Sequence, residues 1–509
     1  MITLQVDGEN RQVTEGSTLA DILPDLDPEC VVAVIRPGSK ESASTRSFRI
    51  FTTAGEVVVE TSATGNEVFS LPALGEGLAL HWNDRYAAAF GPFPRQFSPA
   101  RRAVLYERGD VVLGCGGYDP ARSYLIFTKM RHSSDFGAPG DGGVLGKVVS
   151  GRGVIDRWVT GDRITGVAPV ISWADTTQSF TTRERTTPLE EGMQIVTHAV
   201  IVASGYKEGA IDTGSAASIE KMLLALKDGH FIVERSASTY IEDSRNAGTD
   251  VPEENPVGRR EGSVTLRTRG KSRGSVYIYT TDIPSVPSHT VTGQVVHGIE
   301  LARLARYGDA LCIKVRPERF DLIGLPLDDA VKVAESRGMA LEYDNKPGAR
   351  VVVDQVPGTT LECLAKRSAV LTVIPQEKVI DIRLDDAHAP RSCEIFRRIT
   401  GLDLHAVGRI PFLLNFEEVF LFKPSIPRGI RIDPENAPQE VVPSGTLAIT
   451  NDSRKGVGLV GVRLAENREF GPTSEPFEGT NLIGRVIDTE KLKDLKENET
   501  VYIREVMNG

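Results

Sequence analysis

The amino-acid sequence predicts a multidomain protein that is mainly β with smaller α+β parts. The chain has 509 residues, several times the roughly 100–200 residues of one domain. A pattern of apolar strand, glycine, paired β-branched residues and amphipathic stretch occurs three times, and short alternating apolar runs are frequent. Apolar residues make up 40% and charged residues 25% of the chain, the balance of a folded protein rather than a disordered or fibrous one.

The charge balance and the cysteines narrow the class of protein further. Acidic residues number 69 and basic residues 59, for a formal charge of −10. An acidic chain without a Lys/Arg cluster repels phosphate backbones, so we expect no nucleic-acid binding. The sequence has neither a signal peptide nor an apolar run long enough to span a membrane. Five scattered cysteines without a C-x-x-C pair are typical of reduced thiols, which predicts a cytoplasmic protein.

The first module is expected over residues 1–45. Residues 2–6 alternate as a strand, Asp7-Gly8 turns the chain, a short helix follows, and Val31–Ile35 is a buried strand. This order resembles a β-grasp module of the sulfur-carrier kind. Sulfur carriers need a free C-terminal Gly-Gly, and here the chain continues through Gly38. We therefore expect a docking module without carrier chemistry.

Three glycines mark the repeated pattern: Gly146, Gly293 and Gly484. Each lies two residues before a pair of β-branched residues. In two of the copies a Phe-Gly pair comes between the preceding strand and the marker glycine: Phe136-Gly137 and Phe470-Gly471. The spacing between copies is too long for a solenoid and indicates separate domains.

The pattern resembles the C-terminal part of cyclophilin-fold domains, in which a strand of the type V-x-G-K-V-x-x-G leads into the last helix. The last copy also has a matching front half, in which an alternating strand near Lys378 leads into a helix that begins near Pro390 and is capped by Gly401. We expect cyclophilin-like β-barrels as copies 1, 2 and 3 over three ranges: 46–175, 176–320 and 376–509.

Residues 321–375 depart from the repeat. They contain a helix that ends at Gly338, followed by strands around Val351–Val353 and Val370–Ile374. The order resembles the small α+β module called PASTA, which occurs on cell-wall-sensing kinases. Because the sequence has no export signal, we expect a structural insert.

No motif of the sequence assigns a cofactor or a metal. Gly456, Gly458 and Gly461 form a G-x-G-x-x-G, but an alternating strand follows it instead of the helix that a dinucleotide site needs. None of the eight histidines has zinc-ligand spacing. Cys115, in an accessible-looking Gly-rich turn, is the first candidate for a reactive thiol or for a ligand to a shared cluster. A structural thiol is the preferred interpretation.

The cyclophilin resemblance also predicts no catalytic residue. Active peptidyl-prolyl isomerases use a Phe-His-Arg segment, a Gln-Gly-Gly-Asp stretch and an Asn-Gly-Ser-Gln-Phe-Phe strand, and no copy here contains any of them. Rotation about X–Pro faces a barrier of about 18–20 kcal/mol, which such donors lower by holding the twisted amide. We expect the fold without its chemistry.

From end to end, the order of modules resembles the methanogenesis marker protein 3 family of methane-metabolising archaea. Two late segments, Glu469–Pro476 and Leu482–Ile487, add to the resemblance. It implies an association with the ATP-dependent activation of methyl-coenzyme M reductase. We therefore expect a non-catalytic scaffold or assembly factor whose partners are that reductase and its activation factors. A prolyl isomerase or foldase acting on enzymes of methanogenesis, or a protein that binds a small ligand or cluster, is the alternative.

Overall fold

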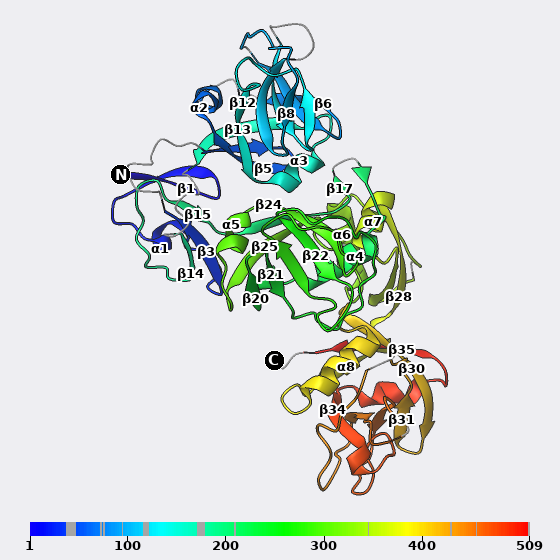
Figure 1. Ribbon diagram of the computed structural model, residues 1–509. Helices are drawn as coiled ribbons and strands as arrows, with labels where there is room; N and C mark the ends of the chain where they lie inside the picture. Colours follow the sequence, from blue (N-terminus) through cyan, green and yellow to red (C-terminus); the bar gives the residue numbers. More distant parts are fainter. Residues whose placement is uncertain are drawn as a thin grey trace. The chain divides into compact units, whose positions relative to one another are not determined.

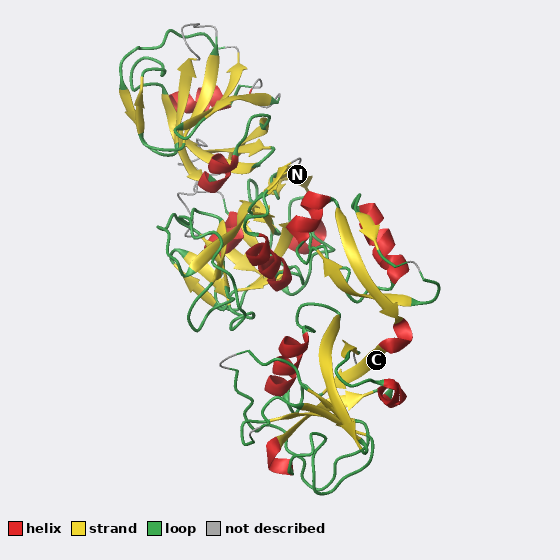
Figure 2. Ribbon diagram, turned by 90° about the vertical axis from the view of Figure 1, so that its right-hand side faces the viewer, coloured by secondary structure: helices red, strands yellow, loops and turns green. Residues whose placement is uncertain are grey.

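The computed structural model describes most of the chain and confirms a mainly β, multidomain protein (Figures 1 and 2). Two compact units divide at Arg319, so that unit 1 is Met1–Arg319 and unit 2 is Phe320–Gly509. Among the described residues, every helix is too short or too polar to cross a membrane. The described ranges are 1–36, 47–71, 74, 77–93, 95–115, 122–170, 179–207, 210–344, 346–427, 430–454 and 456–506.

The first barrel lies within residues 47–170. Eight strands close in the order β10-β7-β6-β13-β4-β5-β12-β9. Phe90, Phe127 and Trp158 fill its interior with edge-to-face ring contacts of 4.8–5.8 Å between centroids, the geometry that aromatic quadrupoles favour. Its elements are β4 Ser47–Thr52, β5 Gly55–Thr61, α2 Ala63–Phe69, β6 Leu78–Asn83, β7 Ala87–Phe93, β8 Val104–Tyr106, β9 Asp110–Cys115, β10 Ser123–Thr128, β11 His132–Ser134, β12 Val144–Ser150, α3 Arg152–Arg157 and β13 Arg163–Val170.

A second ring of strands forms from residues 199–316. Its path runs β25-β16-β24-β22-β23-β21-β20, and β19 pairs with the other edge of β25. Only Val233 and Glu234 separate β19 from β20, so these two strands act as one bent strand that closes the ring. The elements are β16 Ala199–Ala203, β17 Tyr206–Lys207, β18 Ala210–Ile211, α4 Ala216–Ala225, β19 His230–Ile232, β20 Arg235–Ala237, β21 Tyr240–Asp243, β22 Ser263–Arg267, β23 Val276–Tyr279, β24 His289–His297, α5 Ile299–Leu304 and β25 Ala310–Arg316.

The N-terminal module is discontinuous, which differs from the expected boundary at residue 45. Its first part is β1 Ile2–Val6, β2 Glu9–Val13, α1 Leu19–Ile22 and β3 Cys30–Ile35, and its second part is β14 Phe180–Thr182 and β15 Gln194–Val196. Strand β15 lies between β1 and β3, parallel to the first and antiparallel to the second. We expected the residues of β14 and β15 to belong to the second copy. That assignment is wrong, because a local sequence pattern does not show that a strand pairs with a partner more than a hundred residues away.

Strand β3 also joins this module to the second ring. Its first residues pair in parallel with β25, so the two modules share one sheet of 13 strands. All six residues of β3, Cys30–Ile35, are buried, as expected for a strand covered on both faces. The first module is therefore not a separable appendage.

Unit 2 starts with the small α+β part and ends with a barrel. A three-stranded sheet in the order β26-β28-β27 is followed by a closed barrel in the order β29-β34-β32-β33-β31-β30-β35. The helix expected from Pro390 to the cap at Gly401 is α8, and Gly401 has the left-handed φ of +81°. The elements are α6 Leu327–Ser336, β26 Ala340–Glu342, β27 Arg350–Val356, α7 Thr360–Lys366, β28 Ser368–Pro375, β29 Val379–Leu384, α8 Pro390–Thr400, β30 Val407–Phe416, β31 Val419–Phe422, β32 Thr446–Thr450, β33 Val460–Arg463, β34 Thr480–Val486 and β35 Thr500–Glu505.

The three marker glycines occupy the same place in their strands. At Gly146 in β12, Gly293 in β24 and Gly484 in β34, the register with a neighbouring strand shifts, which marks a β-bulge. A Cβ at Gly146 or Gly484 would collide with a backbone carbonyl of the other neighbouring strand. The glycines therefore let two strands approach closely at a bend of each barrel wall.

Candidate functional site: an ionic network within unit 1

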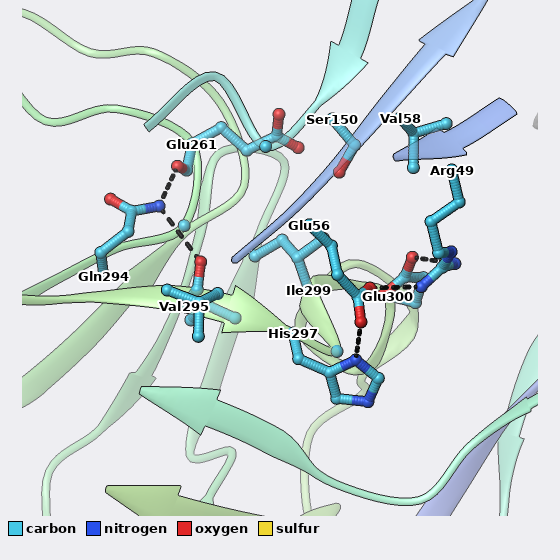
Figure 3. A pocket seen from close by; sticks show the side chains of 14 residues that line it. Arg49, Glu56, Val58, Ser150, Glu261, Gln294, Val295, His297, Ile299 and Glu300 are labelled. Carbon is cyan, nitrogen blue, oxygen red and sulfur yellow. Dashed lines mark hydrogen bonds and ion pairs between the residues drawn. The ribbon is translucent and has the colours of Figure 1, made fainter. Parts of the chain in front are cut away.

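A group of charged side chains, two of them buried and three partly buried, lies where the modules of unit 1 meet (Figure 3). The first barrel contributes Arg49 from β4 and Glu56 from the start of β5. The second ring contributes His297, the last residue of β24, and Glu300 in α5. The N-terminal module contributes Asp7, which occupies the turn between β1 and β2 with a φ of +48°.

His297 bridges two carboxylates. Its Nδ1 lies 2.7 Å from Oε1 of Glu56, and its Nε2 lies 3.4 Å from Oδ1 of Asp7. Asp7 is held in place by Thr197, whose backbone N–H donates to Oδ1 at 2.8 Å and whose hydroxyl donates to Oδ2 at 2.6 Å. His198 Nδ1 lies 3.6 Å from the same carboxylate. One imidazole thus links the first barrel to the N-terminal module.

Arg49 completes the network on its other side. Its two terminal nitrogens donate to Oε2 of Glu56 at 2.7 Å and to Oε1 of Glu300 at 3.0 Å. The side chains of Arg49 and Glu300 are 3% and 2% exposed. A guanidinium suits this position because its planar fork serves two carboxylates at once.

Burial and hydrogen bonds together set the pKa values of the ionisable side chains in the network. Burial lowers the pKa of His297, but the hydrogen bonds with Asp7 and Glu56 outweigh it and raise that pKa to about 10. Burial raises the pKa values of Asp7 and Glu56, yet hydrogen bonds, with His297 the largest contributor, hold both below their ordinary values. The pKa of His198 is lowered, chiefly by burial. His297 is therefore an imidazolium and His198 a neutral imidazole.

The charges nearly balance without any added ion. Three carboxylates, on Asp7, Glu56 and Glu300, face the two cations Arg49 and His297. Ligand atoms of Asp7, His198 and His297 lie within 4.8 Å of one another, and both ring nitrogens of His297 face carboxylate oxygens. The adjoining pocket has a volume of about 20 Å³, enough for a water rather than an organic substrate. The arrangement is a structural ion cluster.

The residues singled out in the sequence lie elsewhere. Cys115 ends β9 and is 3% exposed, with its N–H donating to the carbonyl of Phe136 at 2.9 Å, so the expectation of an accessible turn is wrong at the thiol itself. Phe136 stacks on Tyr106 at 5.2 Å, and Gly137 is packed against Gly142. Phe470 is 42% exposed, and Gly471 packs against Thr480.

Sequence reasoning missed the ionic network because its members come from three modules. The repeated pattern did contain one indication that His297 is unusual. The position four residues after the marker glycine is Ser150 in the first copy, His297 in the second and Asp488 in the third. Only the second copy places an ionisable ring there.

Comparison with known proteins gives the family. A UPF0288 protein of Methanosarcina barkeri is 33% identical over 99% of this chain and 98% of its own length. The chain belongs to the UPF0288 family. Another member, from Methanothermobacter thermautotrophicus, is 31% identical and also aligns over 99% of this chain. These relatives come from methanogenic archaea.

The last barrel also matches a domain family. Residues 380–506 match the family model described as "Putative peptidyl-prolyl cis-trans isomerase domain". Among solved structures, a cyclophilin from Hirschia baltica is 11% identical, covers 31% of this chain and 84% of its own, and has a TM-score of 0.21. A cyclophilin-type isomerase from Cryptosporidium parvum is 13% identical, with 24% and 98% of the two chains covered and a TM-score of 0.19.

Proposed function

We propose that this UPF0288 protein is a non-catalytic scaffold or assembly factor of methanogenesis that acts in the activation of methyl-coenzyme M reductase. The observation that carries the proposal is the role of the ionic network, in which Asp7, Glu56 and His297 bond to one another and tie three modules together. The full-length match to proteins of methanogenic archaea supports the metabolic setting. The choice of reductase rests on the resemblance to methanogenesis marker protein 3.

An exposed sheet edge supports a docking role. Strand β2 pairs with β1 on one side and has no strand on its other side among the described residues. The first four residues of this strand, 9–12, are exposed. Such an edge can accept a strand from a partner through main-chain hydrogen bonds.

The register shows which backbone groups are free for a partner. Gln5 N–H and Thr3 C=O bond to the segment before β15, so the alternate residues Leu4 and Val6 bond to β2. Leu4 is opposite Arg11, and the N–H groups of Asn10 and Gln12 therefore point outward. Substituting Gln12→Pro removes an outward N–H at an edge, where proline is tolerated.

The test is affinity purification of the tagged full-length protein from a methanogen under anaerobic conditions. We expect subunits of methyl-coenzyme M reductase and its activation factors with the wild type and with Gln12→Ala. Gln12→Pro should reduce their recovery by about tenfold, since one lost hydrogen bond plus the altered edge costs about 1–2 kcal/mol. Recovery of no reductase or activation factor with the wild type contradicts the proposal.

Prolyl isomerase activity is the second candidate, favoured by the family description of residues 380–506. Since the donor motifs are missing from the sequence, we expect no acceleration of X–Pro exchange, which takes tens to hundreds of seconds uncatalysed. A proline-peptide assay at micromolar protein measures this directly. A tenfold acceleration that a single substitution in the last barrel abolishes would establish the isomerase instead.

A further inference from the structure

A second group of polar side chains in unit 1 takes no part in the ionic network. Asp27, Cys30 and His230 each offer a ligand atom, and the three atoms lie within 4.8 Å of one another. Nε2 of His230 lies 2.8 Å from Oδ2 of Asp27. Cys312 lies on the neighbouring strand β25, directly opposite His230. One thiol, an imidazole and a carboxylate therefore converge, and a second thiol lies on the neighbouring strand.

The strand register brings these residues together. Cys30 begins β3 and lies opposite Ala310 in the parallel pairing with β25. Cys312 is two residues further along β25, on the same face of the sheet as Ala310. On the other edge of β25, His230 lies directly opposite Cys312. Three adjacent strands thus present Cys30, Cys312 and His230 on one face.

Asp27 reaches the group from the turn before β3. Its carbonyl accepts the N–H of Cys30 at 3.2 Å and a guanidinium N–H of Arg185 at 2.8 Å. Arg183 donates to the carbonyl of Glu29 at 2.9 Å. The backbone of the turn is therefore fixed on both sides of Asp27, which places the carboxylate beside His230.

The donor set selects a class of ion. Thiolates and imidazoles suit zinc-type ions, whereas magnesium and calcium require oxygen ligands. Four protein ligands are the usual complement of a structural zinc site. Asp27 and two thiolates would bring three negative charges to the ion, and the cationic side chains of Arg183, Arg185 and Lys314 lie near enough to interact with this group.

We propose that unit 1 contains a binding site for one zinc-type divalent cation, held by four side chains: Asp27, Cys30, His230 and Cys312. Cys30 is fully buried, while the imidazole of His230 and the carboxylate of Asp27 are 27% and 37% exposed, so the ion can enter from solvent. Two ligands belong to the N-terminal module and two to the second ring. The ion would cross-link β3, β25 and β19 and stabilise the attachment of the first module.

The experiment measures metal bound to the full-length protein. Protein purified anaerobically with reductant should contain close to one equivalent of zinc by mass spectrometry. Replacement by cobalt should give thiolate-to-cobalt charge-transfer absorption. Cys30→Ser with Cys312→Ser should remove that absorption and lower the zinc content at least tenfold. Cys363→Ser, a buried cysteine of unit 2, is the matched control and should leave both unchanged.

A third variant keeps the proposal falsifiable if the double cysteine variant fails to fold. His230→Gln changes a partly exposed side chain, and it should weaken zinc binding at least tenfold in competition with a chelator while leaving the far-UV spectrum unchanged. Zinc should also slow alkylation of Cys312 in the wild type. Wild-type protein that binds neither zinc nor cobalt, or that holds a Cys30–Cys312 disulfide when isolated anaerobically, overturns the proposal.

Discussion

At the scale of single residues, two kinds of position decide the structure: ionisable groups that satisfy one another, and glycines where strands approach closely. His297 exemplifies the first, because it is charged only through its two carboxylate partners. Gly484 exemplifies the second, because the carbonyl of Arg383 occupies the place of a Cβ. Each position supports a prediction of its own.

The stability of unit 1 should fall as the pH rises from 7 to 10. The folded pKa of His297 is about 10, above the ordinary 6.5, so its contribution is complete below about pH 6.5 and is lost as the pH rises through 10. We expect a decrease of about 2–4 kcal/mol in the free energy of unfolding over this range. Trp82 and Trp158 belong to the first barrel, and the sequence has no tryptophan after residue 319, so urea unfolding followed by tryptophan fluorescence measures the change.

His297→Gln should flatten this pH dependence and lower the stability at pH 7. The matched control is His388→Gln, because His388 also pairs with an aspartate, at 2.9 Å, but is 71% exposed. An exposed pair contributes little, so this variant should behave as the wild type. An equal pH slope in the wild type and in His297→Gln would show that His297 carries no buried charge.

Gly484→Ala should destabilise the last barrel by at least about 3 kcal/mol, because it adds a steric clash to an unfavourable φ of +150°. The control is Gly401→Ala, which has a positive φ but open space around the added methyl group. It should cost only about 1 kcal/mol. Calorimetry of both variants gives the comparison, and equal losses would mean that close strand approach at Gly484 is unimportant.

Among the helices and strands, local sequence patterns predicted the elements that are determined by residues close to one another in the sequence. The hairpin around Asp7-Gly8 and helix α8, with its Pro390 start and Gly401 cap, follow from turn and capping preferences. The bulges at the three marker glycines were visible as a repeat. The sequence did not reveal strand β15 or the closure of the second ring by β19 and β20, because each of these strands forms by pairing with a strand that is distant in the sequence.

The two candidate sites illustrate the same limit. The ionic network joins Asp7 to His297, and the proposed cation site joins Cys30 to Cys312. In both cases the partners are more than 250 residues apart. Spacing rules for metal and catalytic motifs detect residues of one element, so a cluster assembled from three elements leaves no such signature.

Strand β3 should be required for unit 1 to fold. Deleting residues 1–45 removes a fully buried strand that pairs with β14, β15 and β25, so we expect loss of the native tryptophan fluorescence and rapid proteolysis. Ending the chain at Arg319 cuts at the boundary between the units and should leave the fluorescence native. A deletion variant that stays protease-resistant would mean that the first module is separable.

At the scale of the whole molecule, the chain combines barrel folds, a joined N-terminal module and a small α+β part. Its two polar clusters in unit 1 lie at junctions between modules, and the pocket beside the ionic network has a volume of only about 20 Å³. Such a chain suits assembly with other proteins, and specific protein interfaces bury about 1,200–2,000 Å². Under the proposed function, the protein works within a larger complex.

Sedimentation of a gentle anaerobic lysate of a methanogen tests this claim most directly. The chain alone has a mass of 55.3 kDa. We expect the protein to sediment well above that mass and together with methyl-coenzyme M reductase or its activation factors. Recovery of the protein at the mass of a free monomer, with no reductase or activation factor in the same fractions, would contradict it.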